Sequence, residues 1–456
     1  MSDDATFDLV VAGGGAAGLA RAFWTLAQRP DARVLVVEAK PRLGGWIETQ
    51  HVDGYQVELG PQGFRPDDSI DGFLDRTGLA AGVVPCSDSS KRRWLARGGR
   101  LHQMPGGPGG LIGTRLLSLG AKLRLFWEPR VKSRGADDES VAAFLLRRFG
   151  KETVPFAEAM MSGIYAGDAH TLEVGTVLPM LAELEREAGS VMRGMGRRAK
   201  ARRKAGKPRV HRPTVCTFPG GMQQSVDALA AALGERVLTS TPVQSVAAHD
   251  LGSGEGGFEV ALGGAAARVV QTRELCLATP PAATATLLRS VDEELAQLLA
   301  GIDSVSVAST YLGYDLVAAP PNADGFGFLA PQKELGPVLG AIFSSRVFPQ
   351  QAPAGKLLFR VMSGGFAAPG EVERPDEDLR QQGADLLQRY VGMKQAPEFA
   401  FTSRAMQAIP QYSRGHGRRV AAIAAATARH RGLSLCGAAY RKVSVVGQWS
   451  EEGSRP

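Results

Sequence analysis

Three glycines near the N-terminus have the spacing of a turn that binds the phosphates of a dinucleotide. They are Gly13, Gly15 and Gly18, and an acid, Glu38, follows Gly18 by twenty residues. The first glycine permits a tight turn, the second lets the backbone approach a pyrophosphate, and the third lets a helix pack closely against a strand. A carboxylate at position 38 would accept hydrogen bonds from both ribose hydroxyls, which disfavours a ligand with a 2′-phosphate.

The elements around these residues must bring them together at one edge of a sheet. An apolar, β-rich run at 7–12 precedes the glycines, a helical stretch follows to about residue 28, and a strand at 33–37 leads into Glu38. This order predicts a dinucleotide site in a Rossmann-like α/β domain, in preference to a structural glycine turn in another α/β unit. The predicted binding residues are Gly13, Gly14, Gly15, Ala16, Ala17, Gly18, Glu38 and Ala39.

The segment after Glu38 indicates which dinucleotide is bound. Arg42-Leu43-Gly44-Gly45-Trp46 resembles the RxGG motif of FAD-containing amine-oxidase-like flavoproteins, which an NAD-binding unit does not need. Residues 57–64 resemble the next flavin-contacting turn of those proteins, and 274–280 resemble the strand that closes their FAD sheet. The resemblance implies FAD as the cofactor. It adds these residues to the cofactor site: Arg42, Gly45, Trp46, Gly60, Pro61, Gln62, Gly63, Val243, Ala278, Gly437 and Val443.

Over nearly its whole length the chain resembles the oxygen-dependent protoporphyrinogen oxidase family. The specific segments are Ser-Gly-Ile-Tyr-Ala-Gly-Asp at 162–168, Gly-Phe-Gly-Phe-Leu-Ala-Pro at 325–331 and Ala-Ile-Pro-Gln-Tyr at 408–412. The resemblance implies an α/β fold in which a discontinuous FAD-binding domain joins an α+β substrate-binding domain and a helical membrane-associating lobe. The implied ranges are 1–75, 215–290 and 405–456 for the FAD-binding domain, 85–210 for the lobe and 291–404 for the substrate-binding domain.

The same resemblance implies which residues hold a porphyrinogen substrate. Arg93 matches an arginine that pairs with a propionate, and a planar guanidinium offers a bidentate fork to a carboxylate. Phe326 and Leu329 match residues that hold the macrocycle, and Met362 matches a further apolar wall. Gly163 matches a position whose carbonyl faces the pyrrole N–H groups. From the residues alone, the favoured interpretation of Arg93 is the solvated end of a strand, and apolar residues in such a pattern are more often ordinary core.

The activity implied is the oxidation of protoporphyrinogen IX to protoporphyrin IX by FAD and O2. It removes six electrons in three flavin cycles and yields H2O2, and the cofactor carries the hard chemistry. We accordingly assign no catalytic side chain, because the chain has no nucleophile elbow, HExxH motif or glycosidase-like carboxylate pair, and we interpret His416 as structural.

Three alternatives stay open. One is oxidation of coproporphyrinogen III to coproporphyrin III, which would need more cations around Arg93 for two extra carboxylates. Another is an amine oxidase on the same scaffold, which would need an aromatic cage beside the flavin. The third is a flavin-poor, porphyrin-binding homologue without turnover.

Composition indicates the class of protein and the kind of compartment in which it folds. The 456 residues, 44% hydrophobic and 22% charged, indicate several domains with large cores. The four cysteines, at 86, 216, 276 and 436, form no Cys/His cluster, which excludes a disulfide scaffold, predicts no metal site and favours a reducing compartment. There is no apolar run of about 18 residues, so no membrane-spanning helix is expected. The acidic start at residues 1–4 does not resemble a signal peptide.

The chain has more basic than acidic residues, which suggests an anionic partner. The net charge is +7, and the stretch Arg193–Arg212 contains ten Arg or Lys and no acid. We interpret this stretch as a contact with an anionic membrane surface, with a solvated loop as the alternative. Nucleic acid is disfavoured because no aromatic residues interleave with the charges. The resemblance implies a cytoplasmic protein associated peripherally with the inner face of the cell membrane, and allows a homodimer.

The C-terminus departs from the family. Lys442 stands where the family has a Gly, Val446-Gly447 stands where it has Asn-Asp, and the remaining residues are too few for its full closing helix. In the family this segment addresses the flavin ring. We therefore expect the chain to bind FAD more weakly than its relatives.

Overall fold

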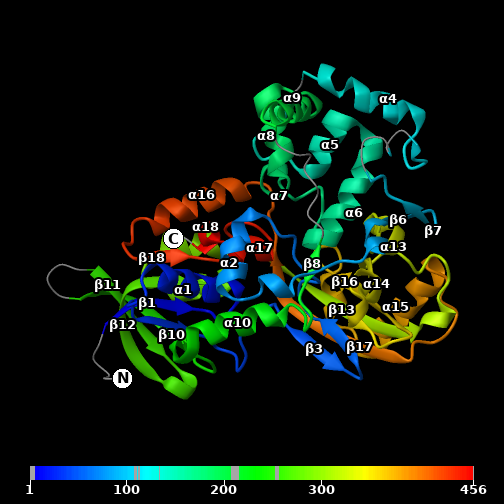
Figure 1. Cartoon of the computed structure of the whole chain (residues 1–456). Helices are drawn as coiled ribbons and strands as arrows, with labels where there is room; N and C mark the ends of the chain where they lie inside the picture. The colour runs from blue at the N-terminus through cyan, green and yellow to red at the C-terminus, as the bar shows by residue number, and fades with distance from the viewer. Residues whose placement is uncertain are drawn as a thin grey trace.

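The chain forms two seven-stranded sheets and a separate helical lobe (Figure 1). The computed structural model describes residues 6–106, 110, 113–132, 134–206, 215–251 and 256–454. The acidic start at 1–4 and the last cations of the basic stretch, at 207–212, lie outside the described residues. In Figure 1 the lobe, coloured cyan to green, lies above the second sheet.

The first sheet has the N-terminal strand near its centre. Its order is β10-β11-β12-β1-β2-β9, and β18 also pairs with β12. β1 is parallel to β2 and β12, and β18 is parallel to β12, whereas β10, β11 and β12 pair in antiparallel fashion. The strands are β1 (Phe7–Ala12), β2 (Val34–Val37), β9 (Val237–Leu238), β10 (Val243–Asp250), β11 (Gly256–Leu262), β12 (Arg268–Leu277) and β18 (Leu433–Leu435).

Alternate residues of β1 pack into two separate cores on the two faces of this sheet. Leu9 and Val11 pack with helices α1 and α10, whereas Val10 and Ala12 pack with α11, α12 and α16. Because successive strand residues point to opposite faces, a continuous apolar run belongs to a sheet covered on both sides. The helices are α1 (Ala16–Gln28), α10 (Gln223–Leu233), α11 (Pro281–Leu288), α12 (Glu293–Ala300) and α16 (His416–Thr427).

The second sheet has the order β17-β13-β16-β15-β14-β6-β7. Helix α15 (Asp376–Tyr390) covers one of its faces, where Leu386 and Leu387 pack with Phe359 and Val361. On the lobe side, α6 (Val154–Tyr165) contacts β14 and β15. The strands are β6 (Trp94–Arg97), β7 (Arg100–Gln103), β13 (Ser304–Asp315), β14 (Gly327–Leu329), β15 (Val338–Ile342), β16 (Lys356–Gly364) and β17 (Phe399–Pro410).

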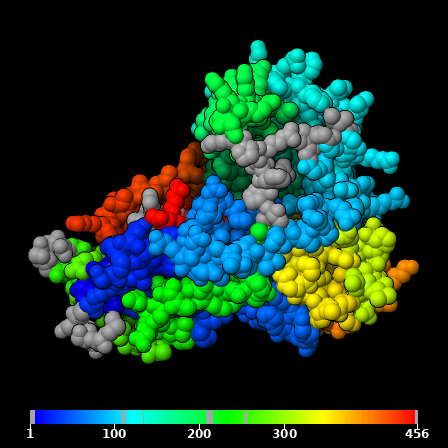
Figure 2. Space-filling view, in the orientation of Figure 1, coloured from blue at the N-terminus to red at the C-terminus, as the bar shows by residue number. Residues whose placement is uncertain are grey.

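Among the described residues, five helices of the lobe contribute to a core of its own that includes Phe144, Met161 and Leu184. Besides α6 these are α5 (Val141–Phe149), α7 (Val174–Val177), α8 (Pro179–Ala188) and α9 (Val191–Lys204). Helix α4 (Leu119–Trp127) buries no residue and contacts α5. Figure 2 shows the lobe projecting from the rest of the molecule. No helix among the residues that the structure describes is both long and apolar enough to cross a membrane.

Short elements complete the chain. They are the hairpin β3 (Thr49–Val52) and β4 (Tyr55–Glu58), the strand pair β5 (Val84–Pro85) and β8 (Cys216–Thr217), and the helices α2 (Asp71–Arg76), α13 (Gln332–Leu335), α14 (Ser344–Val347), α17 (Val445–Trp449) and α18 (Glu451–Ser454).

The predicted α/β fold is confirmed, and two strand groups lie across the predicted domain limits. β6 and β7 fall within the predicted helical range 85–210, yet they belong to the second sheet, where β6 pairs with β14 and β7 pairs with β6. β17 crosses the predicted boundary at 405 and stays in the same sheet to Pro410. We therefore propose the three-part division with residues 94–103 and 399–410 placed in the substrate-binding domain.

Candidate functional site

The glycine turn between β1 and α1 has no room for side chains at two of its glycines. A Cβ on Gly18 would lie 2.0 Å from the carbonyl oxygen of Gly13, and a Cβ on Gly13 would lie 2.7 Å from that of Ala278. Gly13 also has a φ of +112°, which other residues rarely adopt. Ala278 is attached to the same turn, since its N–H donates to the carbonyl of Ala12 over 2.8 Å. The turn is therefore tight, and helix and strand are in close contact.

Glu38 is fixed beside this turn at the end of β2. Its Oε2 accepts a hydrogen bond from the N–H of Gly14 over 2.7 Å, and its Oε1 accepts one from the N–H of Lys40 over 2.9 Å. Each carboxylate oxygen can accept a further hydrogen bond. We propose that this remaining capacity takes the ribose hydroxyls of FAD.

The loop that contains Arg42 runs directly against the glycine turn. The N–H of Gly44 donates to the carbonyl of Gly14 over 2.8 Å. Arg42 donates to the carbonyl of Gly45 over 2.6 Å and forms an ion pair with Glu48 at 2.8 Å, so its guanidinium holds the loop in shape. The adjacent indole of Trp46 is 40% exposed.

The N-terminus of α1 is uncapped, which fits a pyrophosphate. No side chain caps this helix, and no acid lies in its first turn, which begins with Ala16 and Ala17. A Cβ placed on Gly15 would have its nearest neighbour, the Cα of Gly45, 3.8 Å away. The free N–H groups of a helix start attract anions, and only glycines here leave the backbone open to a ligand. The residues present therefore fit the predicted dinucleotide.

The second predicted flavin-contacting turn is held by a residue that sequence reasoning missed, Arg360. Its side chain is buried on β16, and it donates to the carbonyl of Gly60 over 2.6 Å and to that of Leu59 over 3.3 Å. Gly60 and Gly63 leave no space for side chains, because a Cβ would lie 1.7 Å from the carbonyl of Trp46 and 2.4 Å from that of Cys216.

The two residues between these glycines are partly or fully enclosed. Gln62 is buried and its amide donates to Gln351, while Pro61 is half-buried. An Arg within the apolar run 357–362 was the available signal for Arg360.

Glu58, directly before this turn, is a buried acid that sequence reasoning also missed. Its carboxylate accepts hydrogen bonds from the hydroxyl of Thr49 over 2.8 Å and from the N–H of Met222 over 3.0 Å. Burial nevertheless raises the pKa of Glu58 to about 7, against the lowering effects of those hydrogen bonds and of Arg360. Glu58 thereby joins β4 to the start of α10 through a group that titrates near neutral pH.

We expect Glu58 to make stability depend on pH. A pKa raised in the folded state means that the contribution is fully present below about pH 4.5 and is lost as pH rises through about 7. Relative to Glu58→Gln, the wild type should lose up to about 3 kcal/mol of unfolding free energy across that range. Urea denaturation of both proteins at a series of pH values measures the difference. A difference that does not change with pH would contradict the assignment.

Three predicted substrate residues meet on one side of the second sheet. A Cβ on Gly163, in α6, would lie 2.4 Å from the Cδ2 of Leu329, so helix and strand are in direct contact. Leu329 pairs across the sheet with Gly340, which pairs in turn with Met362. Met362 packs with Ala166 and with side chains of β13 and β15. These residues form an apolar row in which Gly340 separates Leu329 from Met362.

The other two predicted substrate residues form a second pair beside this row. The guanidinium carbon of Arg93 lies 5.0 Å from the ring centre of Phe326, within the range of a cation–π contact. The N–H of Phe326 donates to the carbonyl of Arg92 over 2.8 Å, which fixes its backbone beside β6. The structure therefore brings four of the five predicted substrate residues to the region where β6, β14 and α6 meet, whereas Met362 lies two strands away on β16.

The C-terminal segment near Gly437 is supported by Tyr412 and His416. Gly437 has a φ of +131°, and a Cβ there would meet nothing within 4 Å. The hydroxyl of Tyr412 donates to the carbonyl of Ala438, and the ring of Tyr412 stacks on His416 with centroids 4.4 Å apart. Burial lowers the pKa of His416 to about 4, so the imidazole is neutral at pH 7. This placement suits a structural role.

Two predicted cofactor residues pack into cores instead of lining an open site. Val443 packs against the core of the lobe, and Val243, the first residue of β10, packs against the core of the first sheet. Whether either touches the cofactor stays a prediction. The side chain of Lys442 is exposed, and its carbonyl accepts a hydrogen bond from Gln448 in α17 over 3.1 Å. Trp449, at the end of α17, is fully buried, and its carbonyl accepts the indole N–H of Trp24 in α1 over 2.8 Å.

Comparisons with known proteins agree with this geometry. Residues 16–448 match the family described as flavin containing amine oxidoreductase. A protoporphyrinogen oxidase of Macaca fascicularis is 30% identical over 463 residues, which cover 96% of this chain and 95% of that protein. A coproporphyrinogen III oxidase of Propionibacterium freudenreichii subsp. freudenreichii is 29% identical, with 93% and 85% covered. A crystal structure of an Exiguobacterium sp. 255-15 protein shares the fold with a TM-score of 0.79 at 22% identity, covering 99% of this chain and 97% of that one.

The fold and these matches define a flavin-dependent oxidoreductase. The chain belongs to the flavin-containing amine oxidoreductase family, and its similarity to protoporphyrinogen oxidases extends over almost its whole length. FAD is the cofactor, as predicted. The predicted family resemblance and the predicted enzyme class are both confirmed.

Proposed function

We propose that this enzyme oxidises protoporphyrinogen IX to protoporphyrin IX with O2 as the electron acceptor. The observation that carries the proposal is the apolar row formed by Gly163, Leu329 and Met362, with Arg93 and Phe326 beside it. A porphyrinogen is a large apolar disc with carboxylates at one edge, and such a row with a cation beside it matches that chemistry. Relatives about 30% identical that are named protoporphyrinogen oxidases support the same substrate class.

The roles of the chain's own residues follow from this arrangement. FAD supplies the capacity to accept a hydride. Leu329 and Met362 hold the flat face of the substrate, and Gly163 lets the Leu329 side chain pack against the backbone of α6. Arg93 pairs with a propionate, and Phe326 holds the Arg93 guanidinium in place. The full oxidation removes six electrons in three steps of two, and each step reduces one O2 to H2O2.

A second substrate, coproporphyrinogen III, is favoured by the similarity to the Propionibacterium enzyme. It has four carboxylates and would need further cations near Arg93. The two preceding cations already form ion pairs. Arg92 pairs with Asp324, and the Nζ of Lys91 lies 2.6 Å from the carboxylate of Asp88. Those pairings favour the substrate with two carboxylates.

A direct assay tests the substrate. We expect the purified protein with FAD to convert protoporphyrinogen IX to fluorescent porphyrin in air much faster than autoxidation, and faster than it converts coproporphyrinogen III. Porphyrin fluorescence with and without added FAD measures both rates. A higher rate with coproporphyrinogen III would show that this compound is the preferred substrate. No rate with either compound in excess FAD would refute the proposed porphyrinogen oxidation.

Arg93 can be tested separately. Because a charge-assisted hydrogen bond to a carboxylate contributes about 1.5–3 kcal/mol, Arg93→Ala should raise KM by roughly ten- to a hundredfold. Arg93→Lys should raise it much less, because the charge is kept. Arg100→Ala, at the other end of the same β6–β7 hairpin, is the matched control and should leave KM unchanged. Equal effects of the two Arg93 variants would show that this side chain binds no carboxylate.

We also propose that the lobe contacts the inner face of the cell membrane. Helix α4 exposes Leu119, Leu123, Phe126 and Trp127, with exposed fractions of 75%, 61%, 61% and 60%. These positions recur at the spacing of one helix face, which is unusual for side chains that face water. The basic helix α9 belongs to the same lobe, so an apolar face and cations occur together, as in interfacial helices.

Vesicle binding tests this contact. We expect Leu123→Ser/Phe126→Ser to weaken co-sedimentation with anionic vesicles by about tenfold or more, because each buried apolar side chain contributes about 1.5–3 kcal/mol. Leu316→Ser/Val317→Ser removes two exposed apolar side chains outside the lobe and serves as the control. Equal binding by both double variants would contradict a contact through α4.

A further inference from the structure

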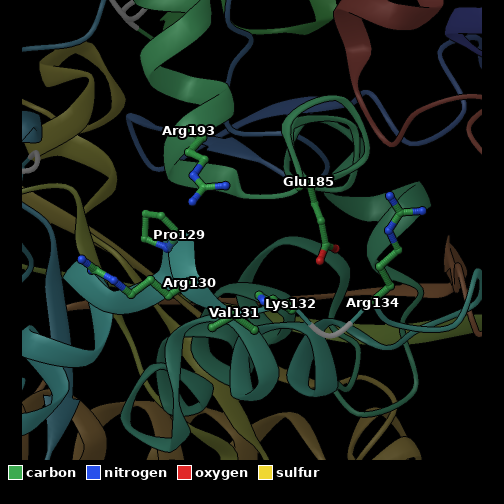
Figure 3. A pocket seen from close by; sticks show the side chains of 8 residues that line it. Pro129, Arg130, Val131, Lys132, Arg134, Glu185 and Arg193 are labelled. Atoms are coloured by element: carbon green, nitrogen blue, oxygen red, sulfur yellow. The ribbon is translucent and has the colours of Figure 1, made fainter.

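The lobe contains a basic cavity that no role described so far uses. It measures about 490 Å³, which is within the size range of small-molecule sites. Its walls are the segment that follows α4, the C-terminal half of α8 with the residue after it, and the first turn of α9. The lining residues are Pro129, Arg130, Val131, Lys132, Arg134, Glu185, Gly189 and Arg193. Figure 3 shows Arg193 and Glu185 projecting into the space, with Arg130 and Arg134 at its two ends.

The charges around the cavity favour an anion. Its one acid, Glu185, already forms ion pairs with Arg147 at 2.7 Å and with Arg148 at 3.3 Å. In the part of the chain that the structure describes, no carboxylate forms an ion pair with any of the four lining cations. These are Arg130, Lys132, Arg134 and Arg193. The cavity therefore holds an excess of positive charge.

The walls of the cavity are fixed from behind by a buried ion pair. Arg148 and Glu128 are 1% and 0% exposed and contact each other. Arg148 also donates to the carbonyls of Val131 and Gly189, over 3.0 Å each, and both of these residues line the cavity. The carboxylate of Glu128 accepts a hydrogen bond of 3.1 Å from the N–H of Met192, in the first turn of α9. The backbone segments that carry the lining cations are thus held in place by Arg148 and Glu128.

The cavity adjoins the apolar face of α4. The guanidinium carbon of Arg130 lies 4.3 Å from the ring centre of Trp127, so one lining cation touches one exposed apolar residue. A ligand that combined a phosphate with a hydrocarbon chain would satisfy both surfaces. Free phosphate would contact only the cations of the cavity.

We propose that this cavity binds the headgroup of an anionic phospholipid, with the acyl chains lying along Trp127 and α4. The proposal rests on the proposed membrane contact and deepens it, since it assigns a specific headgroup site in place of a general attraction to negative charge. It predicts that the cavity cations matter more than equally exposed cations elsewhere on the lobe.

The test compares two triple variants of the full chain with FAD bound. One is Lys132→Ala/Arg134→Ala/Arg193→Ala in the cavity. The other is Lys200→Ala/Arg202→Ala/Lys204→Ala, which removes three charges from the distal end of α9. Vesicles of phosphatidylcholine, with or without phosphatidylglycerol, measure the preference for an anionic lipid. We expect the cavity variant to lose that preference by about tenfold or more, and the α9 variant by about threefold or less. Blue-shifted Trp127 fluorescence, absent in Trp127→Phe, should accompany binding.

Three outcomes would overturn parts of this inference in distinguishable ways. An equal loss in both triple variants would leave the membrane contact intact and refute the headgroup site. Failure of the wild type to bind any vesicle would refute the membrane contact. Titration with soluble dioctanoyl phosphatidylglycerol would then still support the site if the cavity variant alone lost binding. Inorganic phosphate binding as tightly as that short-chain lipid would refute a lipid ligand in favour of a free anion.

Discussion

One buried guanidinium, that of Arg360, connects the cofactor side of the molecule to the substrate side. It extends from β16 of the second sheet to the carbonyls of Leu59 and Gly60 and also contacts Ser309. A buried charge is tolerated only where hydrogen bonds replace its water, so these contacts are obligatory for the fold. Met362 lies two residues further along the same face of β16, and its row leads to Leu329. This side chain therefore helps to fix the apolar row relative to the predicted flavin-contacting turn, together with Tyr311 of β13, whose hydroxyl donates to the carbonyl of Glu58.

The glycine turn could be predicted from sequence because most of the residues that shape it, from Gly13 to Glu38, are close together in the chain. The one distant contact, with Ala278, follows a strand whose end resembles a known motif. The contact of Arg360 could not be predicted, because its partner Gly60 is 300 residues away, and the apolar run around Arg360 indicates only that this charge is buried and not what it contacts. Glu58 was missed for the same reason, since its acceptor role depends on Met222, 164 residues away. β6 and β7 were assigned to the helical segment because only pairing with β14 identifies them as part of a sheet. The basic stretch was noticed as a charge run, but the cavity was not, because its cations come from two segments that the buried Arg148 brings together.

The lobe and the second sheet share α6. This helix contributes Met161 and Tyr165 to the core of the lobe, and it presents Gly163 to Leu329. Glu128, directly after α4, contacts Arg148 of α5 and the start of α9, so these three helices are joined to one another. The surface proposed to meet the membrane and the wall proposed to hold the substrate are therefore parts of one continuous packed unit.

The order of strands in the first sheet has a consequence for how the protein is made. β1 begins at Phe7, yet it pairs with β12 at 268–277, and β12 also pairs with β18 at 433–435. Trp449 then accepts a hydrogen bond from the Trp24 indole through its carbonyl, and its ring stacks on that of Phe73 with centroids 4.9 Å apart. A sheet built from such distant segments forms late and leaves apolar surface uncovered until it closes. The first sheet therefore closes only when residues 433–435 have joined it, and until then the apolar faces of β1 and β12 are exposed to aggregation.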